Sequence, residues 1–277
     1  MRIVLGIACT LVALAAPGSA SAVIGGKTVQ SGAYPYVVAV GDAQGPECGG
    51  TLIAASVVLT AAHCVAGRQA SSVRVLLGSH ALPASFAVAE ASGRATRVTA
   101  VYVHPKFTPE GLHYDAALLL LAHPAAGLRA IAMSAASPAA GTRVSAAGWG
   151  MTKEHGATSP GHLRSVSVAV GTARSCGGGA TPGRYFAPSM LCAGSPGRDT
   201  CSGDSGGPLV ATLHGRLELV GITSFGIGCA EPRHPGMYTR VSSIRAWALE
   251  QVARSTAASV RLAELTATAA RAAVPVA

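Results

Sequence analysis

The chain has 277 residues, of which 12% are charged and 4% aromatic, and it carries 34 glycines, 16 prolines and a net charge of +9. This length allows one large domain or two modest ones. Frequent glycine and proline favour short strands joined by tight turns and argue against a helical bundle. The basic residues, nearly all arginine, are scattered along the chain, so no nucleic-acid partner is expected. At most, their excess favours an acidic surface or substrate.

Residues 1–22 have the three parts of a secretory signal peptide. Arg2 precedes an apolar run over 3–16, and small residues in an A-x-A pattern end the segment at 20–22. A membrane anchor is the alternative, but the apolar run is well short of the roughly 20 residues needed to span a bilayer. We therefore expect a secreted, extracellular protein with no membrane association once the signal is removed.

Seven cysteines are present, and Cys9 would be removed with the signal. The remaining even number, in an exported chain, favours three disulfides. Zinc is the alternative, but the sequence contains no C-x-x-C pair, a common pattern in structural zinc sites. Spacing alone leaves the pairing open. The six cysteines of the mature chain are Cys48, Cys64, Cys176, Cys192, Cys201 and Cys229.

Short apolar and β-branched runs, separated by Gly, Pro or Ser, divide the chain into two sets. The first set lies within about 23–121 and the second within about 142–240, and the Pro/Ala/Gly-rich stretch 122–141 is expected to connect them over the surface. We therefore predict an all-β protein with two antiparallel halves. The expected strands are 36–40, 51–53, 57–60, 73–77 and 97–103, then 143–145, 163–168, 208–211 and 217–222.

The pattern changes near residue 241, where a helix is expected. Ser242 or Ser243 would cap it. Beyond it, residues 255–277 are rich in Ala and Thr with no clear apolar face, so we expect a loose tail, with a continued helix as the alternative. The side chains expected on the buried side of the helix are Ile244, Trp247 and Val252.

Three short stretches carry the residue types that together hydrolyse amides. A serine hydroxyl becomes a nucleophile when an imidazole takes its proton and a buried carboxylate holds that imidazole in the right tautomer. The stretches TAAHC, YDAALL and GDSGGP supply His63, Asp115 and Ser205. Each alone has an ordinary explanation, as a packed histidine, a strand end or a glycine turn. All three in this order make coincidence negligible.

These stretches resemble the His, Asp and Ser signatures of the trypsin/chymotrypsin family of serine proteases, in the chain order particular to that family. The resemblance covers a protease domain over about 23–254 and includes VIGG at 23–26, GWG at 148–150 and PGMYT at 235–239. It implies two six-stranded antiparallel barrels with the active site between them, and a C-terminal helix. It also implies a secreted, monomeric, trypsin-like endopeptidase that acts on protein or peptide substrates, meets proteinaceous inhibitors and uses no cofactor or metal. A bacterial source is expected.

The resemblance assigns roles to residues around the nucleophile. Backbone N–H groups of Gly203 and Ser205 would face the oxygen that becomes negative in the tetrahedral intermediate. Asp199 matches the floor of the pocket for the residue before the scissile bond, and Gly226 and Gly236 match its walls. A carboxylate there favours Arg or Lys, because a buried charge needs a partner. The alternative is that Asp199 is an ordinary surface charge.

Ser224, Phe225 and Gly226 resemble the family's Ser-Trp-Gly strand, which binds the substrate backbone as an added β-strand. Phe225 replaces the usual tryptophan. Strand pairing uses backbone groups and should survive this change, whereas the shape of the neighbouring subsite should differ. Leu112 is expected to help wall that subsite.

In the family, a freed N-terminal ammonium pairs with the Asp that precedes the nucleophile, and Val23 and Asp204 match those positions. Most relatives keep a propeptide that ends in Arg or Lys, whereas Val23 directly follows small residues that suit a signal peptidase. We hypothesise that export itself generates the active N-terminus, with no zymogen stage. The rival is a cut after Ala20, which would leave a dipeptide and a latent enzyme.

The family's calcium loop matches 78–90, which offers a single acid, Glu90, too few for a dedicated site. The main alternative to an enzyme is a non-catalytic protease homologue that acts as a binding module. Such relatives typically lose a triad member, and none is missing here. The disulfide pairs that the resemblance suggests are Cys48–Cys64, Cys176–Cys192 and Cys201–Cys229.

Overall fold

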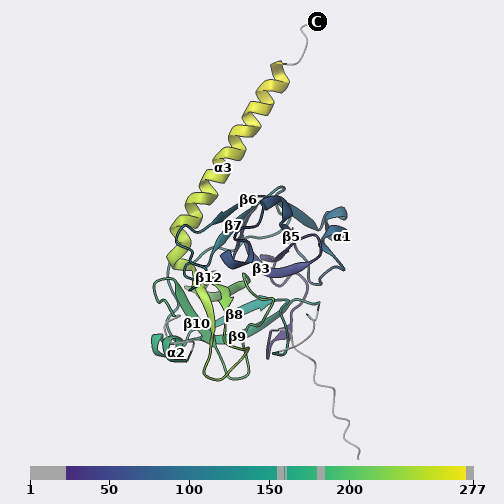
Figure 1. The fold of residues 1–277 in the computed structure, drawn as a ribbon. Helices are drawn as coiled ribbons and strands as arrows, with labels where there is room; N and C mark the ends of the chain where they lie inside the picture. The colour runs from purple at the N-terminus through teal and green to yellow at the C-terminus, as the bar shows by residue number, and fades with distance from the viewer. Residues whose placement is uncertain (1–22, 155–158, 160, 180–184, 273–277) are drawn as a thin grey trace, which may run out of the picture.

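The computed structural model describes residues 23–154, 159, 161–179 and 185–272. Beyond residue 257 it describes the backbone only. The expected signal peptide and residues 273–277 at the end of the expected tail lie outside the described residues. Figure 1 shows two β-barrels packed against each other and a long C-terminal helix that runs away from them.

Six antiparallel strands close the first barrel in the order β2-β3-β4-β7-β6-β5. Valine and leucine dominate these strands, and such side chains suit a pleated surface with a buried face. Two of the strands, β2 and β4, are buried at every position. The strands are β2 (Val37–Gly41), β3 (Pro46–Ala54), β4 (Val57–Thr60), β5 (Arg74–Leu76), β6 (Ala95–Val103) and β7 (Ala117–Leu121).

The second barrel is also a closed ring of six antiparallel strands, because β9 pairs with both β8 and β10. A further short strand, β1 (Lys27–Thr28), adds to β9 outside the ring. The all-β class with two six-stranded barrels is therefore confirmed. The ring consists of β8 (Arg143–Gly148), β9 (Arg164–Val170), β10 (Met190–Gly194), β11 (Pro208–Leu213), β12 (Arg216–Phe225) and β13 (Gly236–Arg240).

A buried arginine attaches the segment between residues 23 and 28 to the second barrel. The Arg164 guanidinium donates to Thr28 Oγ1 and to the Gly26 carbonyl, each at 2.8 Å. Arg164 is 6% exposed, and burial lowers its pKa. Because a buried charge is tolerated only with hydrogen-bond partners, these bonds fix the path of the chain that leads to Val23.

The C-terminal helix α3 (Val241–Ala272) is confirmed, but its start and its length differ from expectation. The helix begins at Val241, and Ser243 Oγ donates to the Arg240 carbonyl at 2.7 Å, so the expected capping by Ser242 or Ser243 is wrong. The expected loose tail is instead helical through Ala272, since alanine has the highest helix propensity. The face predicted to be buried packs against the first barrel's core as expected, through Ile244, Trp247 and Val252.

The other helices are short: α1 (Phe86–Ala91), α2 (Ala173–Gly179) and two 3-10 turns, η1 (Ala62–Cys64) and η2 (Ala70–Ser72). Across the part of the chain that the structure describes, no helix combines the length and apolar character needed to cross a membrane.

Three disulfides are present, and their pairing agrees with the one suggested by the resemblance. Cys48–Cys64 ties β3 to η1, Cys176–Cys192 ties α2 to β10, and Cys201–Cys229 joins the two segments that flank Ser205 and Phe225. Each closes a modest loop, which stabilises the fold by about 3 kcal/mol in the chain-entropy account.

Candidate active site

His63 and Asp115 meet at the end of the first barrel that faces the second. His63 lies in η1, directly after β4, and Asp115 directly precedes β7, the strand that pairs with β4. The His63 ring nitrogen Nδ1 lies 2.7 Å from Asp115 Oδ2, and the His63 backbone N–H donates to Asp115 Oδ1 at 2.9 Å. Asp115 is fully buried. The carboxylate therefore holds both the ring and the backbone of the histidine.

Two strands of the second barrel complete the surroundings of Asp115. Ser224 Oγ on β12 donates to Asp115 Oδ2 at 2.5 Å, and Thr239 Oγ1 on β13 donates to the Asp115 carbonyl at 2.8 Å. A carboxylate that accepts three hydrogen bonds is stabilised in its charged form. These bonds also cross from one barrel to the other, so they fix the relative position of the two halves of the site.

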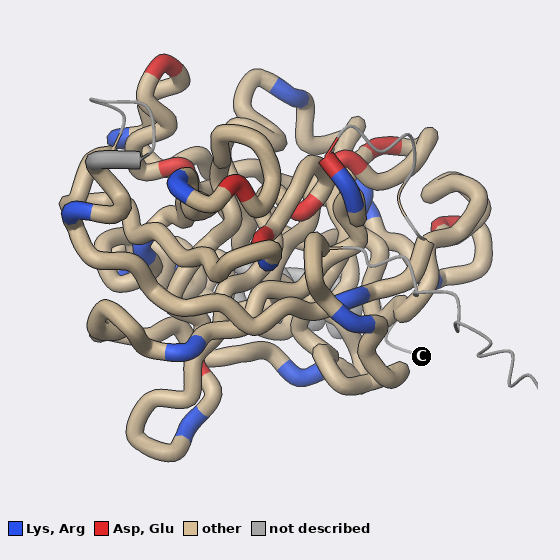
Figure 2. Tube along the Cα trace, turned by 90° about the horizontal axis from the view of Figure 1, so that it is seen from below, with Lys and Arg blue, Asp and Glu red and all other residues tan. Residues whose placement is uncertain are grey.

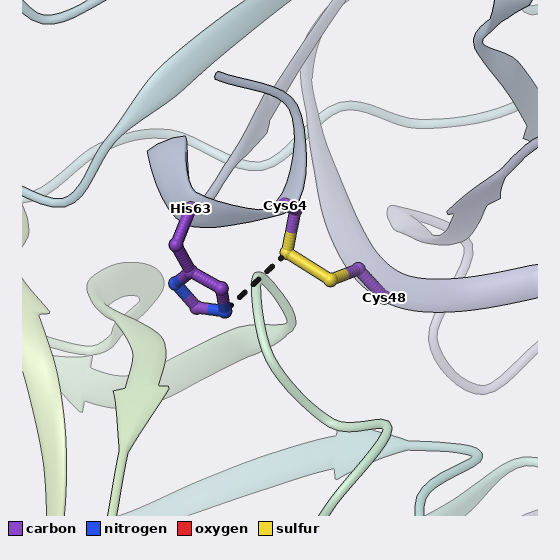
Figure 3. A group of neighbouring side chains, drawn as sticks. All are labelled: Cys48, His63 and Cys64. Atoms are coloured by element: carbon purple, nitrogen blue, oxygen red, sulfur yellow. Dashed lines mark hydrogen bonds between the residues drawn. A yellow bond between two sulfur atoms is a disulfide. The ribbon is translucent and has the colours of Figure 1, made fainter. Parts of the chain in front are cut away.

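The outer nitrogen of His63, Nε2, faces the Cys48–Cys64 disulfide. Nε2 lies 3.7 Å from Cys64 Sγ. Figure 3 shows the ring beside this disulfide. Because Nδ1 must donate to the carboxylate, neutral His63 carries no proton on Nε2, and a disulfide sulfur has none to donate. Nε2 therefore keeps its lone pair for an incoming proton. Both sulfurs are held in the disulfide, so this cluster of two cysteines and a histidine is not a metal site.

Ser205 lies in a tight turn pressed against the first barrel. Its carbonyl accepts a hydrogen bond from Gly49 N at 2.7 Å, and Gly206 N donates to the Thr223 carbonyl at 2.7 Å. Ser205 lines the same pocket as Ser224, whose hydroxyl is bonded to Asp115. No hydrogen bond joins Ser205 to His63 among the described residues. Catalytic hydrogen bonds are often long before substrate binds.

The turn around Ser205 presents two unpaired backbone donors. In the described part of the chain, the N–H groups of Asp204, Gly206 and Gly207 donate to backbone carbonyls, whereas those of Gly203 and Ser205 donate to none. Gly203 has φ +93°, a conformation that residues with a side chain rarely adopt. This alternation is the arrangement that an oxyanion hole requires.

Asp204 is buried beneath this turn and has no cationic partner within the described residues. Its Oδ1 accepts from Gly150 N and its Oδ2 from Cys201 N, each at 2.9 Å. Asp204 is 1% exposed, and burial raises its pKa to about 6 despite these two bonds. Val23 is fully buried in the second barrel's core, and its φ is +54°. That conformation is an outlier for a β-branched residue.

A pocket of about 390 Å³ opens beside Ser205, and its walls include Phe225, Gly226 and Gly236. Asp199 lies behind this lining. Its Oδ1 accepts from Thr200 N at 2.8 Å, and the Gly236 backbone also donates to the carboxylate. A Cβ at Gly236 would lie 2.6 Å from Asp199 Oδ1, so only glycine allows this approach. Asp199 is 2% exposed, and burial raises its pKa to about 7.

The sequence was compared with known protein families. A family model described as Trypsin matches residues 23–248. The chain belongs to the trypsin family. The two barrels, the three disulfides and the three signature stretches all fall within the matched residues.

Individual members of the trypsin family match most of this chain. Serine protease 56 of Mus musculus is 40% identical over 241 residues, which cover 83% of this chain and 38% of the mouse protein. Trypsin of Saccharopolyspora erythraea is 35% identical over 235 residues, with 83% of this chain and 98% of that trypsin covered. Vitellin-degrading protease of Bombyx mori is 36% identical, with 83% and 85% covered. Most relatives found are animal proteins, so they do not support the expected bacterial source.

Phe225, which lines this pocket, belongs to a cluster of aromatic and sulfur-containing side chains. It packs with Tyr185 against the Cys176–Cys192 disulfide and Met237. Leu112 has φ +51° in the loop before Asp115, and its role as a subsite wall stays a prediction. Phenylalanine in place of tryptophan keeps an aromatic side chain at the pocket.

Three residues around the site were not predicted from the sequence. Thr239 lies within the recognised PGMYT run, and that run could have pointed to its bond with Asp115. Thr200 follows Asp199 directly and binds its carboxylate. Glu154 lines the pocket beside Gly228 and belongs to no motif, so no sequence signal marked it.

Proposed function

We propose that this chain is a secreted serine endopeptidase that cleaves peptide bonds after Arg or Lys through an acyl-enzyme on Ser205. The observation that carries the proposal is the pairing of His63 with a buried Asp115, at 2.7 Å, next to a pocket lined by Ser205. The trypsin family to which the chain belongs supports it. Three disulfides fit an extracellular protein.

In the proposed mechanism, His63 Nε2 takes the proton of Ser205 Oγ as the oxygen attacks the substrate carbonyl carbon. The carbonyl oxygen becomes negative and accepts hydrogen bonds from Gly203 N and Ser205 N. The imidazolium, stabilised by Asp115, then protonates the leaving amine, and the acyl group stays on Ser205. Water, deprotonated by the same nitrogen, then attacks the ester carbon. As the bond from that carbon to Ser205 Oγ breaks, Nε2 returns the proton to Oγ and the carboxylic acid product leaves.

The proposed preference for Arg or Lys rests on Asp199. Its carboxyl is buried and hydrogen-bonded to Thr200 and Gly236, both of which line the pocket. A guanidinium or ammonium group that enters the pocket would supply the positive charge that this carboxylate lacks. The energy of that pairing would favour basic side chains over neutral ones of equal length.

Backbone strain supports the proposed activation at Val23. A φ of +54° in a β-branched residue costs on the order of 1–3 kcal/mol. The torsion φ exists only while a residue precedes Val23, so cleavage after residue 22 removes the strain. The new ammonium would form at a buried position in the second barrel, and Asp204 is a buried acid with no cationic partner among the described residues.

Two measurements on the secreted protein test the proposal. A phosphonate that modifies active serines should label the protein but not its Ser205→Ala variant, and absence of labelling would favour the binding-module alternative. In a panel of fluorogenic peptides, Arg and Lys before the cleaved bond should be preferred. Asp199→Ser should reduce kcat/KM on arginyl peptides by two to three orders of magnitude, roughly the cost of losing one partner of a buried ion pair. Asp42→Ser, at a hairpin outside the site, is the control.

N-terminal sequencing of the same material tests the activation step. A start at Val23 in active protein is expected. A start at Ser21 in fully active protein would show that the free Val23 amine is not required.

A further inference from the structure

A large groove lies on the second barrel, and Ser205 is not among the residues that line it. It is a groove of about 750 Å³ formed by three separate segments, 169–175, 194–199 and 230–235. Its volume is in the range typical of small-molecule sites. Of the residues that line it, Asp199 alone has a role in the proposed function.

Three arginines from the three segments line this groove: Arg174, Arg198 and Arg233. All three are exposed, and none of their guanidinium groups forms a hydrogen bond or ion pair with another described residue. Other arginines of the chain do find acidic partners within its described part. These are Arg68, Arg74, Arg97 and Arg254.

The acidic residues of the groove do not balance this charge. Glu231 is its single exposed carboxylate. Asp199 also borders the groove, but it is buried and its carboxyl is bonded to the backbone of Thr200. Three positive side chains therefore face one negative side chain around a concave surface.

We propose that this groove binds a compact polyanion that carries two or more phosphate or sulfate groups. Guanidinium groups bind such anions through paired, charge-assisted hydrogen bonds, and separate segments can engage separate anionic groups. An extended nucleic acid is disfavoured, because basic residues elsewhere stand on many separate loops and form no continuous stripe (Figure 2).

Calorimetric titration of the secreted protein with sucrose octasulfate, and separately with pyrophosphate, tests this site at about 0.15 M salt. All variants carry Ser205→Ala to prevent self-digestion. Both probes should bind, and the sulfated sugar should bind more tightly if the groove accepts a polysaccharide unit rather than a free phosphate compound. Each of Arg174→Gln, Arg198→Gln and Arg233→Gln should weaken binding about tenfold.

Two further variants make the outcome specific. Arg216→Gln removes another exposed arginine, outside the groove, and should leave affinity unchanged. Glu231→Gln should strengthen binding several-fold, since it removes the opposing charge. Absence of binding by both probes, or equal loss in the Arg216 variant, would overturn the proposal. Tighter binding of a DNA duplex than of sucrose octasulfate would replace it with an extended nucleic-acid surface.

Discussion

The two barrels contribute to the site in opposite electrostatic states. In the first barrel, the buried Asp115 accepts hydrogen bonds from His63 N, His63 Nδ1 and Ser224 Oγ. In the second barrel, two buried acids have raised pKa values: about 7 for Asp199 and about 6 for Asp204. Burial is the main cause in both cases. The first half of the site is satisfied by the fold itself, whereas the second half lacks positive charge.

This difference indicates which half of the site can be switched. A carboxylate that is already stabilised gains little from another partner. A buried carboxyl with a raised pKa gains much from a cation, because ionisation then ceases to be costly. Under the proposed function, the N-terminal ammonium of Val23 would serve Asp204, and the substrate's basic side chain would serve Asp199.

The largest effect should follow from removing the acid proposed to receive the N-terminus. Asp204→Asn should lower kcat/KM by about a thousandfold, since losing one partner of a buried ion pair costs roughly 3–5 kcal/mol. Steady-state kinetics on an arginyl peptide would measure this. Asp42→Asn, which changes an aspartate on a first-barrel hairpin, should leave the rate unchanged. Near-normal activity of Asp204→Asn would break the comparison, because the second half would then need no cation.

The next largest effect is the pH dependence of inhibitor binding at Asp199. The pKa of Asp199 is raised from its ordinary 3.8 to about 7, so below pH 7 the carboxyl of the free protein is protonated. A competitive amidine inhibitor binds the ionised form, so its affinity should fall about tenfold per unit as pH drops from 7 to 5. The raised pKa of Asp199 also affects stability. Between about pH 4 and pH 7 this carboxyl is protonated in the folded protein and ionised in the unfolded chain, so the free energy of unfolding falls as pH rises through this range. Inhibition constants between pH 5 and 8 would check the first statement.

That pH dependence should disappear in Asp199→Ser, where the inhibitor also binds weakly. An inhibition constant of the unmodified protein that stays flat from pH 5 to 8 would show that Asp199 is ionised throughout this range. The contrast between the two barrels would then rest on Asp204 alone.

A smaller effect should follow from the bond that joins the halves. Ser224→Ala removes a hydrogen bond to the charged Asp115, and such bonds contribute about 1.5–3 kcal/mol. We expect kcat on an arginyl peptide to fall at least tenfold. Thr239→Val, which removes a bond to the Asp115 carbonyl and leaves the bonds of the carboxylate intact, should lower the melting temperature with little loss of kcat. Equal losses of kcat in the two variants would assign Ser224 a purely structural role.

Sequence patterns predicted which residues come together better than they predicted the electrostatics of the site. The triad residues stand in contiguous signatures, and the short apolar strands imply two β-halves, which the family resemblance specifies as barrels. The raised pKa values of Asp199 and Asp204 depend on burial by residues distant in the chain, which no local pattern encodes. Glu154 lines the pocket from a segment with no motif. The helix beyond residue 254 has no apolar stripe from which it could have been predicted. Local signals therefore identified the family, while tertiary packing set the electrostatics of the buried acids.

The smallest effect extends the comparison to the rest of the first barrel. Glu90 is the lone acid of the segment that matches the family's calcium loop, and its carboxylate accepts from Arg74 Nε at 2.6 Å and from Arg97 Nε. These bonds lower the pKa of Glu90. Two guanidinium groups thus occupy the oxygens that a metal ion would use. Glu90→Gln should reduce the free energy of unfolding by about 1 kcal/mol at pH 7, the scale of exposed ion pairs.

Chemical denaturation at several pH values would measure this loss. Because the pKa of Glu90 is lowered in the folded state, its contribution is present at neutral pH and lost as pH falls through that value, so the variant and the unmodified protein should converge in acid. Added calcium or a chelator should leave both unchanged. If calcium stabilised the unmodified protein but not Glu90→Gln, the first barrel would also depend on an external cation, and the contrast between the two barrels would hold for the catalytic residues alone.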